Sequence, residues 1–133
     1  MARRGMRLLK WSFLIGAMAD AFVAANWFLI ASGSPIPNMM CGLLGEGEEY
    51  RFAMYISALF MTGWTAILAW GWFRPFERKA LLLITAVLLL VSIGLEVAFY
   101  GPLLGGSGFV FGVAVRLALI TKFTVSYFYS RDG

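Results

Sequence analysis

Hydrophobic positions fill four long stretches of the chain, and polar residues gather between them. The stretches cover about residues 8–31, 51–73, 80–100 and 107–129. Each is close to the ~20 apolar residues that an α-helix needs to cross a bilayer, allowing some tilt. Because lipid cannot satisfy backbone hydrogen-bonding groups, each stretch is expected to be helical. The pattern predicts an all-α protein, a four-transmembrane-helix bundle that forms a single integral membrane domain over residues 1–133.

The composition changes this picture little. Of the 133 residues, 61% are hydrophobic and only 14% are charged, whereas soluble domains carry about 25% charged residues. A basic start followed by apolar residues also fits a signal peptide, but the first apolar run is longer than a usual signal core and contains Asp20. We therefore expect a membrane helix there, and a lipid bilayer around the whole domain.

The charges between the stretches are distributed unequally. Bases gather in residues 1–10 and 74–79, whereas the loop over residues 32–50 holds three glutamates, with the base Arg51 at its end. By the positive-inside rule, both termini should be cytoplasmic and the 32–50 loop should lie outside. This predicts an antiparallel, up-down-up-down bundle. The net charge of +4 then reflects membrane topology, and we expect no nucleic-acid partner.

An acidic residue, Asp20, lies at the centre of the first stretch. A charge there costs roughly 2.5–3.5 kcal/mol to insert, so a partner is expected. At 1.5 Å per residue, Asp20 lies roughly 16 Å and Arg116 roughly 13 Å below the outer ends of their helices. We therefore predict a buried Asp20–Arg116 ion pair. Glu96, near the outer end of the third stretch, is within reach of Arg116 or Arg51. The sequence leaves open whether this cluster is structural or forms a ligand or proton site.

Small residues predict where helices approach closely. Gly108 and Gly112 form a GxxxG motif in the last stretch, and Ala17 and Ala21 belong to a ridge of small residues in the first. Close contact between these two helices would bring the expected ion pair together. The apolar loop over residues 32–50 is expected to fold back over the outer mouth of the bundle.

Several classes of chemistry have no sequence signature here. The chain has no histidine and a single cysteine, Cys41, so neither an intramolecular disulfide nor a histidine metal site can form. GxSxG, HExxH and P-loop motifs are missing. We expect no metal and no cofactor, and the sequence favours a non-enzymatic protein. A carboxyl–arginine pair could still support proton chemistry on a lipid-like molecule.

Four short segments carry a resemblance: residues 16–20 (GAMAD), 51–54 (RFAM), 63–65 (GWT) and 75–79 (PFERK). Through them the chain resembles a group of small bacterial and archaeal membrane proteins that have four predicted helices and an aspartate in the first. The resemblance covers roughly the first two-thirds of the chain. It implies the four-helix topology and a prokaryotic origin, hence the plasma (inner) membrane. The group has no assigned activity, so no catalytic or binding residue is implied.

Three functions remain open at this stage. The first is a structural or accessory subunit of a homo-oligomer or larger membrane complex, with other membrane helices as partners. The second is a carrier or channel for a small solute or proton, which uses the buried charges. The third is a protein or enzyme that binds a lipid or apolar ligand in an outward-facing pocket. The missing catalytic motifs and the small size favour the first.

Overall fold

The computed structural model describes residues 2–130, and this part of the chain contains helices and no strand. The helices, in order, are α1 (Ala2–Ala31), α2 (Glu48–Gly71), α3 (Pro75–Arg78), α4 (Ala80–Tyr100) and α5 (Gly106–Tyr129). Over residues 2–130, four helical segments are long and apolar enough to cross a membrane. The third of these segments, Pro75–Tyr100, consists of α3 and α4 together. The predicted all-α class and the four candidate spans are confirmed.

The helices differ from the apolar stretches at several points. Helix α1 begins at Ala2, upstream of the apolar residues, and carries Arg3, Arg4 and Arg7 on exposed positions. Between the second and third stretches, the basic turn contains α3, which begins at Pro75. Proline suits the first position of a helix because its missing N–H would have no partner there.

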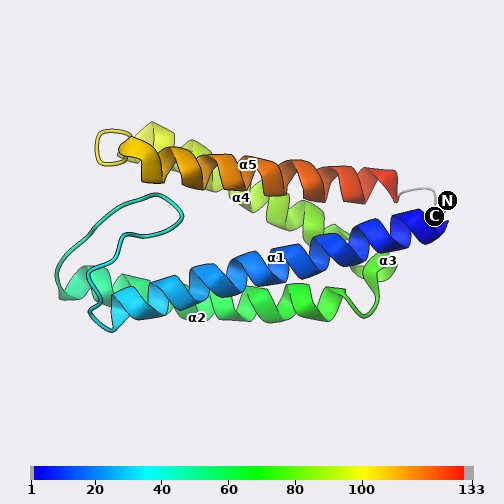
Figure 1. Cartoon of the computed structure of the whole chain (residues 1–133), viewed down its shortest axis with the longest axis horizontal. Helices are drawn as coiled ribbons and strands as arrows, with labels where there is room; N and C mark the ends of the chain where they lie inside the picture. The colour runs from blue at the N-terminus through cyan, green and yellow to red at the C-terminus, as the bar shows by residue number, and fades with distance from the viewer. Residues whose placement is uncertain (1, 131–133) are drawn as a thin grey trace.

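The long helices form two pairs, which Figure 1 shows one above the other. In the first pair α1 lies along α2, and in the second pair α4 lies along α5. The pairs meet at the end of the molecule where α1 begins and α5 ends, which we call the terminal end (Figure 1). At the other end, the connection between α1 and α2, residues 32–47, folds back into the space between the pairs (Figure 1).

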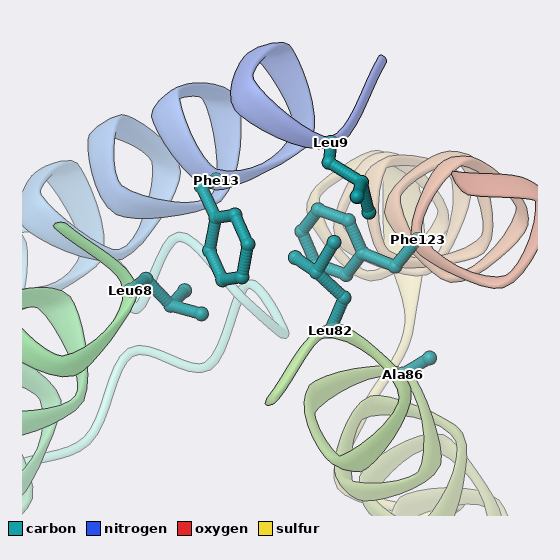
Figure 2. Close-up of a cluster of buried hydrophobic side chains, with 6 residues drawn as sticks. All are labelled: Leu9, Phe13, Leu68, Leu82, Ala86 and Phe123. Carbon is teal, nitrogen blue, oxygen red and sulfur yellow. The ribbon is translucent and has the colours of Figure 1, made fainter. Parts of the chain in front are cut away.

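A cluster of buried side chains joins the two pairs near the terminal end, and all four long helices contribute to it (Figure 2). Its members are Leu9, Phe13, Leu68, Leu82, Ala86 and Phe123. Two glycines allow the close approach: a Cβ on Gly71 would collide with the Phe13 ring, and one on Gly16 would press on Phe123. In a bilayer such a cluster stabilises mainly through van der Waals contacts, since lipid is as apolar as the side chains.

Hydrogen bonds reinforce this end of the molecule. The hydroxyl groups of Ser12 and Ser126 lie 2.6 Å apart and join α1 to α5. The Ser130 hydroxyl donates to the Gly5 carbonyl oxygen at 3.4 Å, and the Lys79 ammonium donates to the Ser130 carbonyl oxygen at 3.0 Å. These bonds therefore join the two pairs at the end of the molecule where α1 begins and α5 ends.

Large apolar side chains cover the outside of the molecule. Phe60, Phe73 and Phe99 are each more than 70% exposed, at 78%, 75% and 72%. So many exposed large apolar side chains are unusual on a soluble monomer and are typical of a surface that contacts lipid or other apolar helices.

Candidate functional site

The 32–47 segment is fixed to α1 by two asparagines. The Asn38 side-chain oxygen accepts hydrogen bonds from the Trp27 indole N–H at 2.9 Å and from the Met40 backbone N–H at 3.0 Å. On α1, the Asn26 side chain accepts from the Met39 backbone N–H at 3.0 Å. It also donates to the Pro37 carbonyl oxygen at 3.2 Å. These bonds hold the middle of the segment over the space between the helix pairs.

On its other side, the segment packs against the glycine motif of α5. A Cβ on Gly112 would collide with the Met40 carbonyl oxygen, and one on Gly108 would lie 3.0 Å from the Gly42 Cα atom. Gly42 itself has a φ of 73°, a conformation that favours glycine. The backbone of the 32–47 segment therefore packs against the GxxxG motif.

This arrangement differs from the expected contact between the glycines and the first helix. Ala17 is half-buried against the apolar cluster, and Ala21 is exposed. The first and last spans touch mainly near the terminal end, and the inserted segment keeps them apart where Gly108 and Gly112 lie. A backbone segment and a helix are equally able to use a groove of small residues, and sequence spacing does not distinguish them.

Arg116 of α5 is only 3% exposed and is surrounded by acceptors. Its Nη2 donates to Glu96 Oε2 at 2.6 Å and to the Met40 carbonyl oxygen at 3.1 Å. Its Nη1 donates to Ser92 Oγ at 3.0 Å, and its Nε donates to the Gly112 carbonyl oxygen at 3.2 Å. One guanidinium group thus ties α4, α5 and the 32–47 segment together, and Glu96 balances its charge.

The predicted Asp20–Arg116 ion pair is therefore wrong for the residues described: the salt bridge of Arg116 is to Glu96. The depth estimate placed Asp20 and Arg116 at similar heights, but height says nothing about lateral separation. Helices α4 and α5 are neighbours, so the longer Glu96 side chain reaches the guanidinium, whereas the short Asp20 side chain lies across the gap between the pairs. The Asp20 Oδ2 atom is buried and has no hydrogen-bond partner in residues 2–130.

Arg51, the fourth member of the expected cluster, lies apart from Glu96. Its Nε donates to the Ala31 carbonyl oxygen at 3.2 Å, at the end of α1. It also lines a separate hollow of about 230 Å³, together with Tyr50 and residues of the 32–47 segment such as Glu46. Arg51 thus closes the junction of α1 and α2, away from the centre of the molecule.

A cleft between the helix pairs contains Asp20. On one side, a hollow of about 240 Å³ lies between α1 and α5, with Phe22, Phe111 and Val115 among its lining residues. On the other side, a hollow of about 270 Å³ lies between α2 and α4, with Trp64 and Leu88 among its lining residues. We call these two hollows together the interpair cleft.

Four residues line both hollows: Asp20, Met40, Met61 and Leu89. Met40 belongs to the 32–47 segment, which lies in the space between the helix pairs. Leu89 and Leu119, which also line the cleft, pack against the apolar cluster. Phe22, Phe111 and Leu88 are all more than half exposed on the outside of the molecule. The cleft is therefore open sideways, toward the surface that lipid would cover.

The chemistry of the cleft depends on a few polar groups. Among its described lining residues, Asp20 and Arg116 carry the ionisable side chains. Arg116 is already balanced by Glu96, whereas the Asp20 carboxyl group has an oxygen without a partner. A buried polar atom without a hydrogen bond is costly and marks a position where a ligand or another group can bind.

Sequence reasoning identified Asp20, Arg116 and Glu96 but missed the residues that hold the covering segment. Asn26 and Asn38 are polar residues within or beside apolar stretches, and that position is a usable signal. The Met40 carbonyl oxygen has no such signal, because a backbone acceptor can belong to any residue.

Comparison with known proteins adds no constraint on this site. No protein-family model matches the chain, and the searches for similar curated proteins and for similar solved structures found no match. The class of protein rests on the fold alone: a helical protein with four apolar helical segments long enough to cross a membrane, as expected of a multi-pass membrane protein.

Proposed function

We propose that the chain crosses the plasma (inner) membrane of a prokaryote four times, up-down-up-down and antiparallel, with both termini in the cytoplasm. The bases support this orientation, since they gather near the terminal end of the molecule. There, Lys10 lies 5.2 Å from the Trp72 ring centre, and Lys79 lies 5.4 Å from that of Tyr127. Such cation–aromatic contacts suit the headgroup region of a cytoplasmic leaflet.

Within that membrane, we propose that the protein binds a lipid-soluble ligand in the interpair cleft. One observation carries this proposal: Asp20 lines a mostly apolar cleft and has a carboxyl oxygen without a partner. A purely structural acid would be expected to have a partner within the bundle, as Glu96 has in Arg116. A ligand is the natural partner for an acid that the protein leaves free.

The shape of the cleft supports the same function. Its hollows of about 240 and 270 Å³ are slightly smaller than the ~300–1,000 Å³ of pockets that enclose drug-sized ligands. An occupant would therefore place part of its body in the cleft and leave the rest in the bilayer. The sideways openings allow such a molecule to enter directly from lipid.

The test is to identify what the protein retains. The protein is extracted with its native lipid in nanodiscs, and the bound lipophilic molecules are compared with the bulk membrane by mass spectrometry. Val115→Trp fills the cleft between α1 and α5, and Leu117→Trp is the control, because Leu117 is 47% exposed on the same helix but outside the cleft lining.

We expect a defined compound to be enriched with the wild type and with Leu117→Trp, and to be lost with Val115→Trp. If no compound is enriched over bulk lipid, or if Val115→Trp retains it equally, the cleft is not a ligand site and the proposal fails.

A second function, a subunit of a homo-oligomer or larger membrane complex, has its own supporting observation. Ala21 and Ala25 are exposed on α1, so that ridge of small residues is available to another helix. In a Cys41→Ser background, Ala21→Cys should then form disulfide-linked dimers or link to a partner, whereas Ala98→Cys, exposed on α4, should not. Absence of any Ala21→Cys cross-link would count against this role.

A further inference from the structure

The chemistry of the ligand can be narrowed from the hydrogen-bonding groups that remain free in the interpair cleft. Arg116 has little capacity left: a guanidinium group carries five N–H bonds, and four hydrogen bonds are already made. Glu96 balances its charge at 2.6 Å. An anionic ligand would therefore have to compete with Glu96 for Arg116.

The two hydroxyl groups of the cleft are also engaged. Ser92 donates to the Leu89 carbonyl oxygen at 2.7 Å and accepts from Arg116. Thr85 donates to the Leu81 carbonyl oxygen at 2.7 Å and accepts from the Trp64 indole N–H at 3.0 Å. Each hydroxyl has used its one proton, so neither can donate to a ligand without losing a bond to its own helix.

Asp20 is then the polar group that a ligand would meet with free capacity: an ionised carboxyl group accepts hydrogen bonds, and a neutral one can also donate one. An ionised carboxyl group without a counter-charge is very unfavourable in apolar surroundings. A cationic donor would supply both the missing hydrogen bond and the missing charge. Aromatic rings of Phe22, Trp27, Trp64 and Phe111 line the same cleft, and such rings attract cations as well as apolar bodies.

We propose that the ligand of the interpair cleft is a lipid-soluble amine, whose protonated amino group binds Asp20 while its apolar body lies among the methionine and aromatic side chains. This inference rests on the proposed function, since it names the ligand class of the same cleft. Charge complementarity carries it: the one unbalanced ionisable group in the described lining is an acid.

The test compares three probes that share one apolar body and differ in the polar group: phenylbutylamine, phenylbutanol and phenylbutyrate. At neutral pH these are a cation, a neutral alcohol and an anion. Binding of each tritiated probe is measured by equilibrium dialysis against the protein in phosphatidylcholine nanodiscs, with empty nanodiscs as the background.

The variants isolate the carboxyl group. Asp20→Asn keeps the size of the side chain and removes its charge, and Asp20→Glu keeps the charge. Glu77→Gln is the matched control, because it neutralises an acid that is 65% exposed and lies outside the cleft.

We expect the wild type to bind the amine more tightly than the alcohol and to bind the carboxylate most weakly. Asp20→Asn should weaken amine binding by at least about tenfold, the range expected when a charged hydrogen bond is lost, and should leave alcohol binding unchanged. Asp20→Glu should restore the preference for the amine, and Glu77→Gln should not alter it.

Three results would overturn the inference: no saturable amine binding, equal amine binding by the wild type and Asp20→Asn, or a preference for the carboxylate. Each leaves the proposed function to be judged separately, by the native compound that Val115→Trp does or does not displace. Conversely, if Val115→Trp loses that compound while Asp20→Asn binds the amine normally, the cleft is a ligand site and the ligand class is wrong.

Discussion

Arg116 meets acceptors from three parts of the chain: Glu96 and Ser92 on α4, Gly112 on its own helix, and Met40 in the 32–47 segment. Because lipid offers a charge no solvation, such a residue must be satisfied inside the protein. The bond to Met40 has an additional effect, since it makes the position of the covering segment depend on a charge in α5.

Replacing Glu96 with glutamine should destabilise the protein strongly, because Arg116 would remain buried without a counter-charge. Breaking a buried pair from one side costs about 3–5 kcal/mol. The expected result is a free energy of unfolding lower by about 3 kcal/mol, measured by denaturant titration in mild detergent. The control is Glu77→Gln: its partner Arg74 is 65% exposed, and exposed pairs contribute about 1 kcal/mol or less. Equal effects of the two variants would contradict the structural role of the Glu96 pair.

A single methyl group on Gly112 should displace the 32–47 segment, because it would collide with the Met40 carbonyl oxygen. Cys41 reports this movement. It is 8% exposed, and burial raises the pKa of its thiol, so little reactive thiolate is present at neutral pH. We expect Gly112→Ala to speed maleimide labelling of Cys41 severalfold at fixed pH, and wild-type labelling to quicken as the pH rises.

Gly94→Ala provides the comparison, since a Cβ on Gly94 of α4 meets nothing within 4 Å. Its labelling rate should equal that of the wild type. If both alanine variants label alike, Gly112 does not hold the segment in place.

For single residues, the sequence predicts burial better than it predicts ion-pair partners. Apolar neighbours predict that Asp20 and Arg116 lie inside the bundle. Whether Arg116 reaches Glu96 or Asp20 depends on which helices are neighbours and how far apart they stand, and residue spacing within one helix contains neither quantity.

Among the elements, the 32–47 segment is the one that keeps the two helix pairs apart at the end away from the termini. It contacts α1 through Asn26 and Trp27 and α5 through Gly108 and Gly112. It therefore sets the width of the interpair cleft, although it belongs to no helix.

The Asn38 side chain binds both Trp27 and the Met40 backbone, so Asn38→Ala should loosen the segment. The Trp27 indole and the Met40 backbone N–H would both lose their acceptor, at a cost of about 1–3 kcal/mol for each buried donor. A lower thermal midpoint and faster Cys41 labelling are expected. Asn38→Asp retains an oxygen acceptor and should lie between alanine and the wild type; an unchanged Asn38→Ala would show that the two bonds do not hold the segment.

The four apolar helical segments could be predicted because each is a run of about 20 mainly apolar residues, and a backbone in lipid has few alternatives to a helix. The conformation of the 32–47 segment could not. Most of its hydrogen bonds use backbone atoms, either with other backbone atoms or with side chains, and backbone atoms are the same at every position.

For the whole molecule, the proposed orientation makes the two ends chemically distinguishable. In a Cys41→Ser background, Glu46→Cys lies at the end with the covering segment and Glu77→Cys at the terminal end, and both glutamates are exposed. In intact cells, a membrane-impermeant maleimide should label Glu46→Cys, and should label Glu77→Cys only after the membrane is permeabilised. The reverse pattern would place both termini outside and would remove the positive-inside argument.

The meeting of the chain ends has a consequence for how the protein is encoded. Ser130 donates to the Gly5 carbonyl oxygen, and the connection between the helix pairs, residues 72–79, lies at the same end of the molecule (Figure 1). A circular permutant that starts at Arg74, runs through α5, and returns by a short linker to α1 and α2 should keep the present direction of each helix relative to the others. We therefore expect the two helix pairs to assemble in either order along a chain, and to form the same contacts when each pair is encoded by a separate gene.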